Sequence, residues 1–62
     1  MSNHTSTDKM IARTLPHGDL MRTISTLRRR VTQARLVGNG PAMVTLLDQL
    51  EVYTNEFRRR TS

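Results

Sequence analysis

The sequence predicts an all-α protein, folded as an antiparallel two-helix hairpin with a coiled-coil-like seam between its helices. The first observation is a pair of apolar stripes whose steps of three and four residues mirror each other around one break in the chain. The second is the break itself, Gly38-Asn39-Gly40-Pro41, which joins residues that end one helix to a proline that suits the start of another. The stripes consist of Leu20, Ile24, Leu27, Val31 and Ala34 before the break and Met43, Leu46, Leu50, Tyr53 and Phe57 after it.

Folding the chain back at this break brings the two stripes together residue by residue, with Leu27 opposite Leu50 near the middle. Apolar residues must recur about every 3.5 positions if they are to keep facing a partner helix. The stripes meet this condition, so we expect helices over about 19–37 and 41–60. The hairpin domain then comprises residues 19–62.

Charged residues at the helix ends support these boundaries. Asp19 stands directly before the first stripe, where a carboxylate can cap the exposed amide groups of a helix start. Arginines end the second helix, and positive charge there stabilises the helix dipole. Glu56 is followed four positions later by Arg60, which predicts an ion pair along that helix. The register of the stripes also places Arg58 near Asp19, where the two would close the open end of the hairpin.

Residues 1–18 are expected to form a flexible N-terminal tail that contains a short helix. Ser6 or Thr7 would cap this helix, and Pro16 and Gly18 would stop it. The apolar side chains of the short helix would then cover the open end of the hairpin. These side chains are Met10, Ile11 and Leu15.

Size and composition point to association. The chain has 62 residues, no cysteine and a hydrophobic content of 35%. Such a small domain buries a narrow core without help from disulfides, so we expect a homodimer that forms a four-helix bundle. Val52 lies on the outer side of its helix, and Met21 lies beside the first stripe at the open end. Four further apolar residues outside the stripes form the expected contact surface for a protein: Leu36, Val37, Val44 and Leu47.

Two carboxylates on the second helix add weaker support for a dimer. Asp48 and Glu51 have no basic residue four positions along their own helix. They could therefore meet Arg28 or Arg29 of a second copy. Two solvated carboxylates would give the same pattern.

The formal charge is +5, and most of it lies between residues 19 and 37, which carry five arginines and one aspartate. On a helix, four of these arginines fall in two rows on and beside the face opposite the stripe, with hydroxyl and amide side chains between them. Such a surface can follow a row of phosphates, which indicates nucleic-acid contact. A solvated helix surface explains the same pattern, and both interpretations stay open here. The four arginines are Arg22, Arg28, Arg29 and Arg35.

Several classes of function find no support in the sequence. The two histidines, His4 and His17, have no second ligand at metal-binding spacing, so we expect loop residues and no metal. Serines and threonines have no plausible base beside them, so we expect no catalytic residue, no cofactor and no small-molecule substrate. No stretch is apolar enough to cross a membrane and the N-terminus lacks a secretory pattern, which favours a cytoplasmic protein or one inside a host cell.

Together these features predict a small non-enzymatic helical hairpin that associates with itself and binds a protein partner. Adaptors, assembly factors and inhibitors of phages and mobile elements are proteins of this kind. The alternative is a basic accessory protein that contacts nucleic acid through its first long helix. In length and topology the expected hairpin is similar to plasmid copy-number regulators, which dimerise to bind paired RNA loops, and to a ribosomal large-subunit hairpin protein. Likeness of architecture alone does not establish a function.

Overall fold

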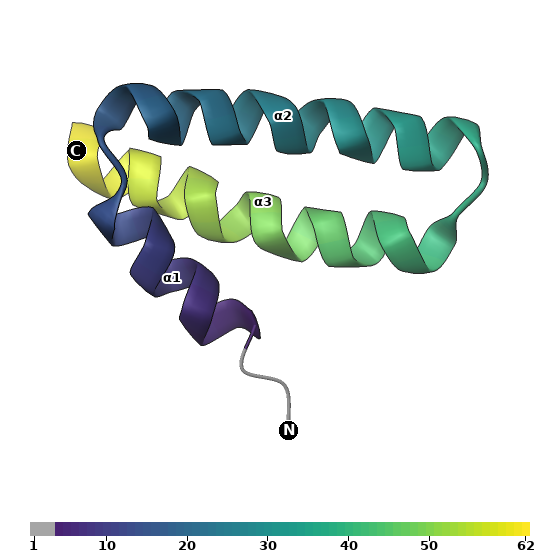
Figure 1. Ribbon diagram of the computed structural model, residues 1–62, viewed down its shortest axis with the longest axis horizontal. Coiled ribbons are helices and arrows are strands. Elements are labelled where there is room, and N and C mark those ends of the chain that lie inside the picture. The colour runs from purple at the N-terminus through teal and green to yellow at the C-terminus, as the bar shows by residue number, and fades with distance from the viewer. Residues whose placement is uncertain (1–3) are drawn as a thin grey trace.

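The computed structural model describes residues 4–62, with side chains from Thr7 onward, and contains three helices. They are α1 (His4–Thr14), α2 (His17–Leu36) and α3 (Gly40–Thr61). This part of the chain has no strand, so the predicted all-α class is confirmed. Figure 1 shows α2 and α3 side by side and running in opposite directions, with α1 near the end of α3 and diverging from it at an angle.

Apolar packing between α2 and α3 forms most of the core. All five stripe residues of α2 are buried, and Leu20 is the one large side chain that is fully enclosed among residues 7–62. On α3, Tyr53 is buried while the other four stripe residues are half-buried. The main core cluster joins Leu20, Ile24 and Leu27 to Val52 and Tyr53, and it also includes Ala12 of α1. The core is therefore narrow, and it lies toward the end of the α2–α3 pair on which α1 packs.

Glycine and asparagine make the turn between α2 and α3. Gly38 has a φ of +72°, the left-handed conformation that a side chain disfavours. Its amide donates to the Arg35 carbonyl at 3.2 Å, and the Asn39 amide donates to the Ala34 carbonyl at 2.9 Å, which together satisfy two of the last carbonyls of α2. The Asn39 side chain then accepts a hydrogen bond from the Ala42 amide at 3.2 Å and caps α3. One short segment thus ends one helix and starts the next.

The start of α2 differs from the prediction. The helix begins at His17, and Pro16, with φ −57° and ψ 152°, occupies the capping position without a side-chain hydrogen bond. Its carbonyl accepts from the Leu20 amide at 2.9 Å, so the proline backbone itself starts the first turn. Asp19 lies inside that first turn, where its charge still favours the helix dipole but does not cap the helix. Proline suits this place because it has no amide hydrogen to satisfy.

The N-terminal helix is longer than expected. It begins at His4, so the prediction of a tail is wrong for residues 4–6, while its part for residues 1–3 lies outside the described residues. His4 and His17 belong to helices rather than loops, and the His17 ring stacks on Phe57 with ring centres 5.7 Å apart. The N-terminal segment thus forms a third helix, α1, which packs against α3.

The side of α1 that meets α3 also differs from the prediction. Ala12 is fully buried and Leu15 packs against the core, whereas Met10 and Ile11 are exposed. Ala12 and Leu15 are three residues apart and share one side of the helix, which Met10 cannot join. Their contact covers Val52, which is buried although its position on the outer side of α3 predicted exposure. A small side chain makes this close approach possible.

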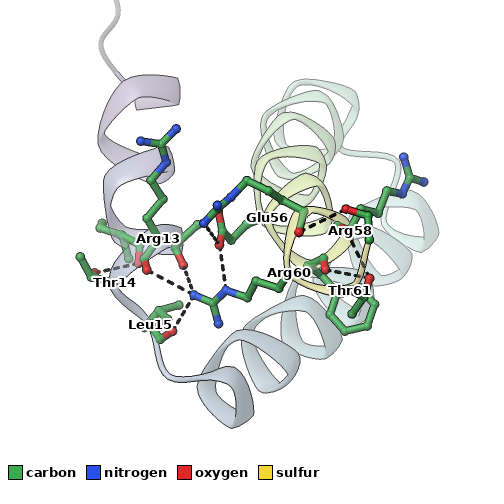
Figure 2. Close-up of polar contacts among 12 residues, drawn as sticks. Arg13, Thr14, Leu15, Glu56, Arg58, Arg60 and Thr61 are labelled. Atoms are coloured by element: carbon green, nitrogen blue, oxygen red, sulfur yellow. Dashed lines mark hydrogen bonds and ion pairs between the residues drawn. The ribbon is translucent and has the colours of Figure 1, made fainter.

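Arg60 fastens α1 to α3, as Figure 2 shows. Its Nη2 atom donates to the carbonyl of Ala12 at 2.9 Å and to that of Leu15 at 2.7 Å, with the Arg13 carbonyl at 3.3 Å. These are among the last carbonyls of α1, which have no amide partner within their own helix. A guanidinium group therefore caps the C-terminal end of α1 from a residue near the other end of the chain.

Glu56 holds that guanidinium in place. The predicted pair with Arg60 forms, with Nε 2.8 Å from Oε2, and Arg59 adds two further hydrogen bonds at 3.1 and 2.9 Å. The Glu56 side chain is only 6% exposed. Hydrogen bonds from Arg59 and Arg60 lower the pKa of Glu56 to about 2. The carboxylate is therefore charged at neutral pH and serves as an anchor for both arginines.

The predicted pair between Arg58 and Asp19 is wrong. Asp19 instead lies 3.8 Å from Arg22, one turn along its own helix. The Arg58 side chain is exposed and points away from α1 in Figure 2. Local spacing along α2 decides this contact, because a neighbour three residues away is reached without ordering a distant side chain.

Candidate interaction surfaces

The four apolar residues predicted as one contact surface are all exposed, but they do not share one face. The exposed fractions are 81% for Leu36, 71% for Val37, 57% for Val44 and 43% for Leu47. Val44 and Leu47 are three residues apart and lie on the same side of α3. Leu36 follows the buried Ala34 by two residues, about 200° around the helix, so it points away from α3. The four residues surround the turn end of the molecule.

The position of α1 decides which face of the α2–α3 pair is open. Leu47 is nine residues from Glu56, about two and a half turns, so it lies on the side of α3 opposite α1. Arg28 is likewise nine residues from Asp19 and so lies on the opposite side of α2, and Asp19 lines a groove with Leu15, the residue that follows α1. Leu47 and Arg28 therefore belong to the face of the helix pair that α1 leaves uncovered.

We call this face the open face. Met21 lies seven residues before Arg28 and therefore shares this face. Val44 and Glu51 lie three residues before and four residues after Leu47, so they share it too. Near the middle of the helices it combines three exposed apolar side chains with one base and one acid, and Arg35 and Arg58 continue the same side toward the two ends by steps of seven residues. The open face consists of Met21 and Arg28 of α2 and Val44, Leu47 and Glu51 of α3.

Charges on the open face have no ion-pair partners among the described side chains. Arg28 and Glu51 are both exposed, and neither forms an ion pair among the side chains of residues 7–62. In the register of the two stripes Arg28 lies opposite position 49, so it is within one turn of Glu51 along the axis. The open face therefore offers one charge of each sign at nearly the same height.

The outer surface of α2 forms a second, chemically different area. Arg22 and Arg29 lie opposite the buried stripe, and Arg28 and Arg35 lie beside them on the side of the open face. All four are exposed, and neither α1 nor α3 covers this side of α2. We call these four arginines, with the polar residues between them, the outer basic surface.

Two contacts within the chain involve the outer basic surface. An acid does lie next to it, since Asp19 is 3.8 Å from Arg22, but both side chains are at least half exposed and such a pair stabilises little. The Thr32 hydroxyl donates to the Arg28 carbonyl at 3.2 Å, so its proton is engaged within the helix. Ser25 and Gln33 remain exposed between the arginines.

The titratable groups of the core are poorly suited to acid–base chemistry. Glu56 is buried, but its pKa near 2 makes it a weak base at neutral pH. Burial, and secondarily the Asp8 carboxylate, raise the pKa of Tyr53. No group of three or more histidine, cysteine or acidic side chains that could hold a metal occurs among the described residues.

No helix within residues 4–62 has the length and the apolar content that crossing a bilayer requires.

Comparisons of this chain with protein-family models, with curated proteins and with solved structures give no significant match. What the molecule does must therefore be inferred from its own surfaces.

Proposed function

We propose that this chain is a non-enzymatic interaction module of the cytoplasm, built from the hairpin of α2 and α3, that works as a homodimer and binds a protein partner. The observation that carries the proposal is the open face, where Met21, Val44 and Leu47 are exposed together on one side of a narrow core. Groups of exposed apolar side chains of this kind mark contact surfaces.

The energetic need for a partner supports this proposal. Fully burying a large apolar side chain contributes about 1.5–3 kcal/mol, so completing the burial of three half-exposed side chains contributes on the order of 3 kcal/mol for each copy. A single native domain is stable by only about 5–15 kcal/mol, and a small one by less. Dimerisation would therefore add a large fraction of the total stability.

The charges favour one arrangement of the dimer. If the two-fold axis runs parallel to the helices, α2 of each copy lies over α3 of the other at the same height, and Arg28 meets Glu51 of the second copy twice. An axis perpendicular to the helices would stack α2 on α2 and bring the two Arg28 side chains together. The first arrangement is a four-helix bundle in which every neighbouring pair of helices is antiparallel.

Sedimentation of the full chain at micromolar concentration tests the dimer. We expect a mass of two chains, which Leu47→Asp reduces to one because it buries a carboxylate in the interface. Leu36→Asp is the matched control, since Leu36 is more exposed but lies outside the open face, on the side of α2 turned away from α3. A folded wild-type monomer, or equal effects of the two substitutions, would contradict the proposal.

Exchange of the two charges tests the arrangement. Arg28→Glu or Glu51→Arg alone should weaken association, and the double substitution should restore it, because each copy then carries the reversed pair. Failure of the double variant to recover would argue against the parallel two-fold axis while leaving the dimer itself standing.

Leu36 and Val37 are the residues that we expect to contact the protein partner. They are the most exposed of the four predicted contact residues and lie outside the open face, so a dimer presents them at the turn end of each hairpin. Binding of a partner should be lost in a Leu36→Asp variant that still sediments as a dimer. A variant that keeps both properties would place the partner elsewhere.

A further inference from the structure

Beyond the proposed dimer, we propose that the outer basic surface of α2 binds the phosphate backbone of a nucleic acid duplex. The chain is most basic here, and all four arginines of this surface are exposed. Arg22 and Arg29 point away from the open face, so the dimer leaves both of them free to bind. The surface and the dimer interface can therefore work at the same time.

The spacing of the arginines fits a repeating row of phosphates. Arg22 and Arg29 are seven residues apart, and so are Arg28 and Arg35, which corresponds to about 10.5 Å along the helix axis. Phosphates on one strand of a duplex recur about every 3.4 Å along its axis, so each row spans about three base pairs. The two rows together extend over about 20 Å of a helix that is about 30 Å long.

The side chains on this surface match a phosphate backbone better than they match bases. Arginine forms paired hydrogen bonds with phosphate oxygens, Ser25 offers a neutral donor between the rows, and Gln33 offers one beside the row of Arg22 and Arg29. Stacking on unpaired bases requires exposed aromatic rings. Neither ring is available for such stacking, because Tyr53 is buried and Phe57 is half-buried against the His17 ring. A duplex therefore fits the surface better than a single strand does.

A poorly paired surface charge also favours an external anion. Among the described residues the one acid within 4 Å of these arginines is Asp19, at 3.8 Å from Arg22, whereas Arg59 and Arg60 at the end of α3 are held by Glu56. Four positive charges in two adjacent rows repel one another. Phosphates would relieve that repulsion and release the ions condensed on the duplex.

A salt titration of binding to a 20-base-pair DNA duplex tests the proposal. In the proposed dimer Arg28 pairs with Glu51 of the second copy, so Arg22, Arg29 and Arg35 remain for the duplex. Three neutralised phosphates predict a slope of log affinity against log salt near −2.7 for each bound chain. The Arg22→Ala/Arg29→Ala variant should reduce the magnitude of the slope, to about −0.9, because two of the three contacts are lost. The matched control is Lys9→Ala/Arg13→Ala, which removes two exposed charges from α1 and should leave the slope unchanged.

Other probes separate the alternatives. A duplex RNA of the same length that binds as the DNA does, with a single strand binding more weakly, supports backbone recognition of a duplex. Equal binding to polyglutamate would overturn the proposal in favour of an acidic protein partner, and so would equal losses in the two double variants. Sedimentation of Arg22→Ala/Arg29→Ala should still give the mass of two chains, so failure here is distinguishable from failure of the proposed dimer.

Discussion

Replacing Arg60 by alanine should release α1 from the rest of the molecule. The helix has 11 residues, which is too short for stability in water without tertiary contacts. Arg60 supplies hydrogen bonds to the carbonyls of Ala12 and Leu15, and alanine leaves both carbonyls without a protein donor. Ala12 and Leu15 still pack against α3, so we expect α1 to open more often rather than to unfold completely.

The size of the effect follows from these two hydrogen bonds. A hydrogen bond to a charged group contributes about 1.5–3 kcal/mol, and the lower value applies because the Arg60 side chain is 20% exposed and water can reach the freed carbonyls. Two bonds then give about 3 kcal/mol. This corresponds to an opening equilibrium that is about 100-fold more favourable.

Amide hydrogen exchange measured residue by residue is the suitable assay. Amides in the last turns of α1 should exchange about 100-fold faster in Arg60→Ala, while those in the middle of α2 and α3 should change little. Arg60→Lys should lie in between, because an ammonium group has no planar fork to reach two carbonyls and Glu56 together. Arg58→Ala is the control, since Arg58 lies in the same turn of α3 and points away from α1.

An unchanged exchange rate in α1 of the Arg60→Ala variant would refute this reasoning. The same conclusion would follow if Arg58→Ala accelerated exchange in α1 equally. Either result would mean that apolar packing alone holds α1.

Further predictions concern acid stability and the turn. Because the pKa of Glu56 is about 2 in the folded chain against 4.5 ordinarily, its contribution is complete above about pH 4.5 and is lost as the pH falls toward 2. The urea midpoint of the wild type should fall over that range, and that of Glu56→Gln should fall less. Gly38→Ala should cost about 1–2 kcal/mol because φ is +72° while the space around a new Cβ is open, whereas Gly18→Ala, with equally open space and no positive φ, should be neutral or stabilising. Asn39→Ala should cost about 1 kcal/mol through loss of the α3 cap, seen as a melting temperature lower by about 4–8 °C.

Local patterns in the sequence predicted the helices well. The 3.5-residue spacing predicted the buried side of α2, and the four-residue step predicted the pair of Glu56 and Arg60. Both depend on contacts whose geometry is fixed by one helix or by two helices joined through a short turn. Such contacts follow from spacing alone because the helix imposes the distances.

The docking of α1 could not be predicted in this way. It depends on Ala12, whose one apolar neighbour at stripe spacing is Leu15, and on Val52, whose burial requires a helix from elsewhere in the chain. Arg60 reaches carbonyls 45 and 48 residues away, and no local rule connects an arginine to distant carbonyls. A run of three arginines at a helix end has a sufficient explanation in the helix dipole, which conceals this second role.

The same docking explains why the candidate surfaces were predicted only in part. Exposure of Leu36, Val37, Val44 and Leu47 follows from their places outside the stripes. Their division between different faces follows from counting residues around each helix, which the prediction of a single patch neglected. Which face of the helix pair stays uncovered depends on the side that α1 occupies, and this side was known only from the structure.

The contact between Arg60 and the Leu15 carbonyl joins residues that are synthesised 45 positions apart. Translation therefore completes the first helix long before its cap exists. Until residue 60 has been added, an emerging chain carries that segment without the hydrogen bonds from Arg60. During this interval the segment is open to proteases and chaperones, and a truncated product that ends before residue 60 should be degraded faster than the longer chain.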